Sequence, residues 1–150
     1  MSLYSIALFF HIVGALLLFV LLTIEGVGLR QGFMAARLNR VLGPISALAI
    51  LVPGLYMSAS QVARGWVVVG ITAWLLIAVG GAATGIGLLA GRLTTRAAAA
   101  SWSIRVGIAL GVVFIMTVKP DLLLAVTAVA AGAALGGAGA FASMRHLRST

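Results

Sequence analysis

Long apolar runs separated by short basic segments make up most of this chain of 150 residues. A helix crosses the roughly 30 Å hydrocarbon layer of a membrane in about 20 residues, and five runs approach or exceed that length. The pattern therefore predicts an all-α fold, a single transmembrane helix bundle over residues 1–150. The predicted spans cover residues 3–24, 41–60, 66–90, 99–118 and 122–142.

The fourth run is the weakest of the five. The apolar stretch from Val106 to Val118 is only 13 residues long, too short to cross a membrane unless the helix begins near Ala99. Arg105 then lies in the first turns of that helix. Four spans and a re-entrant segment are the alternative arrangement.

Two prolines mark the second run. Pro44 lies near its start, where a first helical turn tolerates proline. Pro53 lies inside it, and proline within a helix removes a backbone N–H and kinks the chain. We expect a kinked second helix with a freed carbonyl near Ala49.

The basic residues lie mainly between the runs and indicate the orientation of the chain. Cytoplasmic loops of membrane proteins carry an excess of Lys and Arg. With five spans, one side holds Arg64 and Lys119, and the boundary residue Arg105 is counted with neither. The opposite side holds Arg30, Arg37, Arg40, Arg92, Arg96, Arg145 and Arg148. We therefore predict an external N-terminus and a cytoplasmic C-terminal tail, with the protein in the inner (plasma) membrane of the cell.

Composition narrows the functional classes further. Hydrophobic residues make up 63% of the chain and charged residues 8%, against about 25% charged in soluble domains. The net charge of +8 acts on topology, so we do not expect nucleic-acid binding. The absence of cysteine excludes disulfides, thiolate metal sites and c-type haem attachment.

Glycines recur at four-residue spacing in the later runs. Such pairs let helix backbones approach closely, which is how helices pack where lipid offers no hydrophobic driving force. The pairs are Gly81 and Gly85, Gly87 and Gly91, Gly107 and Gly111, and Gly132 and Gly136. They predict a tight bundle. The same glycine faces can also contact a larger membrane complex or a second copy of the chain.

Ionisable side chains at membrane depth are the candidates for function, because burying them in lipid is costly. His11 lies about eight residues into the first span, roughly 12 Å along its axis, on the outer side of the midplane. Its imidazole can ligate haem iron or copper, relay a proton, or hydrogen-bond to a neighbouring helix. Tyr56 on the second helix is expected at the same depth, where it lines a pocket with His11 or anchors the interface.

Charge pairs account for other ionisable residues. We expect Glu25 and Arg105, both toward the cytoplasmic side, to form a structural charge pair, with a proton or anion pathway as the alternative. Asp121 can neutralise Lys119 or Arg64, or place its carboxylate at the N-terminus of the fifth helix. Trp66 fits an interfacial anchor.

Three features together resemble a superfamily of small bacterial membrane proteins: His11 followed by Gly14-Ala15, a proline-broken second helix, and a helix that ends in apolar-Lys119-Pro120. The superfamily includes the HemJ-type protoporphyrinogen oxidases, the CopD-type copper-resistance proteins and uncharacterised branches. The resemblance covers about residues 4–120. It implies a membrane site for haem b, with His11 as metal ligand and Lys119 near a propionate.

The fifth helix and the sparse polar residues depart from the HemJ type, so an uncharacterised branch without the oxidase activity fits better. Three functions follow as hypotheses. The first is a haem- or porphyrin-associated membrane protein with an outward-facing site at His11, Tyr56 and Lys119. The second is a non-enzymatic accessory subunit or assembly factor, and the third is a small transporter or channel.

Overall fold

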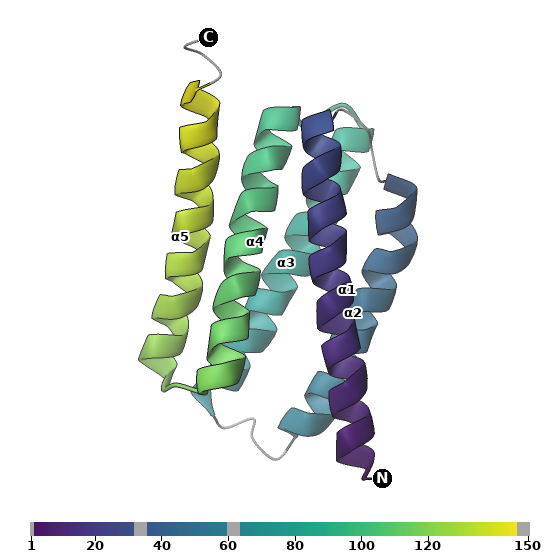
Figure 1. Ribbon diagram of the computed structural model, residues 1–150, viewed down its shortest axis with the longest axis vertical. Coiled ribbons are helices and arrows are strands. Elements are labelled where there is room, and N and C mark those ends of the chain that lie inside the picture. Colours follow the sequence, from purple (N-terminus) through teal and green to yellow (C-terminus); the bar gives the residue numbers. More distant parts are fainter. Residues whose placement is uncertain (1, 32–35, 60–63, 147–150) are drawn as a thin grey trace. The chain divides into compact units, whose positions relative to one another are not determined.

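The structure, a computed structural model, describes residues 2–31, 36–59 and 64–146 and is entirely helical over these ranges (Figure 1). All five helices are long and apolar enough to cross a membrane, as the sequence predicts. They are α1 (Leu3–Gln31), α2 (Ala36–Ser58), α3 (Gly65–Leu89), α4 (Thr95–Val118) and α5 (Leu122–His146). With 24 residues, or about 36 Å of helix, α4 is long enough to span rather than re-enter.

The helices extend beyond the apolar runs that predict them. α1 continues past the predicted limit of Ile24 to Gln31, and α4 starts at Thr95 rather than near Ala99. Helical hydrogen bonding does not stop at the edge of the hydrocarbon layer, whereas apolar composition does. Ser60, the predicted end of the second span, and Arg148 in the predicted tail lie outside the described residues.

The first compact unit contains α1 and α2, which pack as an antiparallel pair. Their crossing lies at Gly14, where an added Cβ would come within 2.8 Å of the Ala49 carbonyl carbon. The buried Ser46 hydroxyl donates a 3.0 Å hydrogen bond to the Gly14 carbonyl at the same place. A missing side chain and one hydroxyl therefore hold the two backbones together.

The second unit contains α3, α4 and α5, with α4 packed against both of the others. Gly107 faces Gly132 so closely that a Cβ on either would overlap the other's carbonyl group. One turn away, the Ser103 hydroxyl donates a 2.7 Å hydrogen bond to the Gly136 carbonyl. We call this contact the α4–α5 seam, and it confirms the predicted close packing for two of the glycine pairs.

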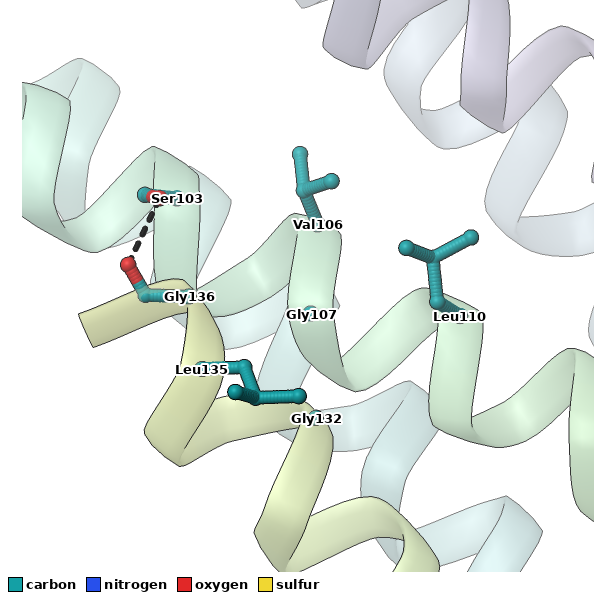
Figure 2. Close-up of a pocket in the computed structure, with 7 residues that line it drawn as sticks. All are labelled: Ser103, Val106, Gly107, Leu110, Gly132, Leu135 and Gly136. Atoms are coloured by element: carbon teal, nitrogen blue, oxygen red, sulfur yellow. Dashed lines mark hydrogen bonds between the residues drawn. The ribbon is translucent and has the colours of Figure 1, made fainter. Parts of the chain in front are cut away.

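An open groove of about 220 Å³ follows the seam (Figure 2). Its floor is glycine backbone and its walls are aliphatic side chains. It is lined by Ser103, Val106, Gly107, Leu110, Gly132, Leu135 and Gly136. Of these lining side chains only Ser103 is polar, and its hydroxyl hydrogen is already donated to the Gly136 carbonyl.

A short turn joins α3 to α4. Gly91 adopts a φ of +65° just beyond α3, a left-handed conformation that glycine accepts without steric cost. Thr94 then caps α4, since its hydroxyl accepts a 3.2 Å hydrogen bond from the Ala97 N–H. The predicted connector from Gly91 to about Ala100 is therefore only a few residues long.

Candidate functional site

His11 lies on the face of α1 that packs against α2. Its Nδ1 is 2.8 Å from the backbone carbonyl oxygen of Ile50, and the ring is partly buried. A carbonyl oxygen can only accept, so in the neutral imidazole Nδ1 carries the hydrogen and Nε2 keeps its lone pair. The structure thus shows the interhelical hydrogen bond that was one of the roles expected for His11. The other ring nitrogen, Nε2, is left with a lone pair that can bind a metal.

The hydrogen-bonded carbonyl belongs to the turn that Pro53 interrupts. Pro53 lies inside α2 and has no N–H to donate to the Ala49 carbonyl four residues earlier. Neighbouring helices commonly satisfy backbone groups freed by proline in a membrane. Here His11 bonds to the Ile50 carbonyl, which is next to the Ala49 carbonyl that Pro53 leaves without its helical donor.

Gly54 provides the surface against which the imidazole lies. A Cβ added there would be 3.2 Å from both Cε1 and Nδ1 of His11, tighter than ordinary van der Waals contact. Gly54 was not among the residues predicted from the sequence, because the glycine pairs at four-residue spacing lie in later helices. The position of Gly54 directly after Pro53 was the sequence signal that could have identified it.

Tyr56 lies on a different face of α2. It is two residues from Gly54, about 200° around the helix axis, and half of its side chain is exposed. His11 and Tyr56 therefore belong to the same unit, but the hydrogen bond and ring contact of His11 are made with Ile50 and Gly54.

Arg105 is the most deeply buried ionisable residue for which a burial is described, with 5% of its surface exposed. It is the eleventh residue of α4, about 15 Å from the start of a helix about 36 Å long. The early start of α4 thus moves Arg105 from the predicted first turns to the middle of the helix. Its stem lies on α3, with Cδ 3.3 Å from the position of a Cβ on Gly80.

One helical turn before Arg105 on α4, the hydroxyl of Ser101 meets that of Thr84 on α3. Thr84 Oγ1 donates to the Gly80 carbonyl at 2.7 Å and lies 2.7 Å from Ser101 Oγ. Since the single Thr84 hydrogen points to Gly80, Ser101 donates to Thr84. Both hydroxyl hydrogens are used within the protein, which makes this cluster a structural connection between α3 and α4.

Glu25 lies in α1 and is partly buried. Glu25 and Arg105 both take part in interactions. They belong to different units, and their pairing stays a prediction from the sequence.

Lys119 ends α4 in a left-handed conformation, with φ 51° and ψ 53°. Its backbone N–H caps the helix by donating to Ile115 at 2.9 Å. Its ammonium nitrogen lies 6.0 Å from the ring centroid of Trp66, within the range of a cation–π interaction. The sequence predicts Trp66 only as an interfacial anchor, so its contact with Lys119 was not expected.

Asp121 caps the next helix. Its Oδ1 accepts a 2.8 Å hydrogen bond from the Leu124 N–H in the first turn of α5. This is the N-terminal role that the sequence analysis offered as one of two possibilities.

The metal-binding capacity of the described residues is limited. Over residues 2–31, 36–59 and 64–146, no group of three or more His, Cys, Asp or Glu side chains could hold a metal ion. A bare ion needs several protein ligands, whereas the metal of a porphyrin brings four and needs one more.

Comparisons with protein families, with characterised proteins and with solved structures found no match. We therefore infer the function from the geometry around His11.

Proposed function

We propose that this integral membrane protein binds haem b or a related metalloporphyrin through Nε2 of His11. The observation that carries the proposal is the 2.8 Å hydrogen bond between His11 Nδ1 and the Ile50 carbonyl. Metal-ligating histidines almost always donate their other ring N–H to a carbonyl or carboxylate, which fixes the tautomer and makes the ligand more basic. His11 has this arrangement.

The scarcity of other ligands favours a porphyrin over a bare ion. Among the described residues no cluster of His, Cys, Asp and Glu could enclose a metal, and the chain contains no cysteine. One imidazole suffices for a metal that already has four equatorial nitrogens. The donor chemistry therefore fits a group with a single axial protein ligand.

Other residues would orient the porphyrin rather than ligate it. From the resemblance, Lys119 is the cation assigned to a propionate, and Tyr56 is the polar residue expected at the depth of His11. When bound, haem supplies electron transfer or ligand binding at its iron. This chain would contribute the axial nitrogen and an apolar surrounding, and we do not extend the proposal to an oxidase reaction.

The absorption spectrum tests the proposal directly. The full chain is purified in mild detergent from haem-replete cells, together with His11→Ala and His146→Ala. We expect a Soret band in the wild type and in His146→Ala and its loss in His11→Ala. A colourless wild type, or a band that survives in His11→Ala, contradicts the proposal.

A second candidate is a non-enzymatic accessory subunit or assembly factor. Only 6% of the residues in the most apolar window of α2, and of α5, are buried within the chain, which leaves apolar side chains of both helices available to other helices. Isolation in mild detergent tests this function. A defined partner in fixed stoichiometry supports it, and a monodisperse single chain speaks against it.

A further inference from the structure

We infer that Pro53 and Gly54 are positioning residues for His11, which together hold its imidazole in the tautomer that carries hydrogen on Nδ1. The consequence for metal binding rests on the proposed function, whereas the tautomer itself does not. Pro53 removes one helical hydrogen bond next to Ile50, Gly54 makes room for the ring, and the Ile50 carbonyl accepts the hydrogen bond from His11.

Pro53 acts through the backbone. Its ring has no N–H to donate to the Ala49 carbonyl and crowds that carbonyl, so the turn of α2 that contains Ile50 lacks one of its helical hydrogen bonds. The Ile50 carbonyl belongs to this turn and accepts from His11 at 2.8 Å. The carbonyl that Pro53 leaves without its helical donor is that of Ala49, one residue before Ile50, so Pro53 acts on the acceptor of His11 through the neighbouring peptide group.

Gly54 acts through the absence of a side chain. An added Cβ would lie 3.2 Å from the atoms Cε1 and Nδ1, which belong to the ring edge that faces α2. Relief of that contact would move Nδ1 away from the Ile50 oxygen. Nε2 lies on the other side of Cε1 from Nδ1. It is therefore not the nitrogen that bonds to Ile50, and it keeps its lone pair.

The crossing of α1 and α2 fixes this register. Gly14 is three residues from His11 and faces Ala49, while its carbonyl accepts from the buried Ser46. Residues three apart share a helical face. The anchor and the imidazole therefore lie on one stripe of α1, and the ring has little freedom to leave Ile50.

Nitrogen NMR of histidine measures the tautomer without haem. The chain has only two histidines, so ¹⁵N-histidine labelling of the full chain grown under haem limitation gives few signals, and His146→Gln assigns them. Couplings to the ring protons show which nitrogen is protonated. We expect the Nδ1–H form to dominate at His11.

Two variants test the positioning residues. Gly54→Ala is compared with Gly43→Ala on the same helix, where an added Cβ has nothing within 4 Å. Pro53→Ala restores an N–H that can donate to the Ala49 carbonyl, without adding a group next to the ring. We expect Gly54→Ala and Pro53→Ala to lower the ratio of Nδ1–H to Nε2–H about fivefold, the effect of one net hydrogen bond, and Gly43→Ala to leave it unchanged.

The results separate the two proposals. A wild type in which Nε2 carries the hydrogen, or a ratio unchanged in both Gly54→Ala and Pro53→Ala, overturns the positioning roles even if a Soret band is present. A dominant Nδ1–H form that both variants weaken, in a protein that takes up no haem, supports the positioning roles while the proposed function fails. Should Gly54→Ala not fold, the result with Pro53→Ala alone decides.

Discussion

His11 and Arg105 are packed in similar ways, but their side chains can make different interactions. Each lies against glycine backbone of a neighbouring helix, His11 on Gly54 of α2 and Arg105 on Gly80 of α3. His11 is partly buried and makes one hydrogen bond to a carbonyl, whereas Arg105 is 5% exposed in the middle of α4. In both units a missing side chain makes room for a polar one.

The comparison teaches that chemistry, rather than burial, distinguishes the candidate site. A neutral imidazole keeps a lone pair, so it can ligate a metal after its other nitrogen has been used. A guanidinium carries only donors and stays charged, so it can pair with an anion but cannot ligate a metal. Arg105 is the more deeply buried residue, yet His11 is the one that could hold a cofactor.

The largest expected effect concerns the role of Arg105 as one member of a charge pair. Arg105→Glu places a carboxylate at a buried position, and loss of a buried charge partner costs about 3–5 kcal/mol. If Glu25 is the partner that the sequence predicts, adding Glu25→Arg restores much of the lost stability. Unfolding midpoints in detergent measure both. A double variant no more stable than Arg105→Glu alone contradicts the pair.

A smaller effect is expected where α3 receives the Arg105 side chain. An added Cβ on Gly81 would lie 3.2 Å from the guanidinium nitrogen Nη1, while Gly85, one turn away, has nothing within 4 Å. Gly81→Leu should therefore be less stable than Gly85→Leu by about 1–3 kcal/mol, the usual cost of overpacking. The same unfolding measurement applies, and equal stabilities would show that Arg105 does not depend on this surface.

The smallest effect tests Asp121, a charged residue whose observed contact is a helix cap. Asp121→Ala removes the acceptor for the Leu124 N–H and should cost about 1 kcal/mol. Asp121→Ser keeps a capping oxygen without the charge and should recover most of that loss. Thermal unfolding compares the three proteins. If Asp121→Ser is as unstable as Asp121→Ala, the carboxylate acts through its charge instead.

The helices were predictable from the sequence because length and apolar composition are set by the membrane itself. The ends of α1 and α4 were not, since a helix continues through the interface until a cap or breaker stops it. Thr94 is such a cap. Its hydroxyl accepts a hydrogen bond from the Ala97 N–H, which requires a particular backbone conformation that an apolar pattern does not encode. The position of Arg105 within α4 changed for the same reason.

The candidate site was predictable in part. His11 stood out as an ionisable residue in an apolar run, and Pro53 indicated a freed carbonyl nearby. Which carbonyl is used depends on how α1 and α2 are aligned, and that register follows from the contact of Gly14 with Ala49. Tyr56 was expected at the depth of His11, but equal depth does not determine which face of α2 a residue occupies, and its role at a site stays a prediction.

The α4–α5 seam has a mechanical consequence. Where Gly107 and Gly132 meet, carbonyl groups rather than side chains form the contact, and no rotamer change can open or reshape it. Sliding or twisting α5 along α4 would drive backbone into backbone, so the two helices can only separate or move as one body. In α2, by contrast, Pro53 removes a helical hydrogen bond, so we expect this helix to bend more easily near Ile50 than α4 or α5 does at the seam.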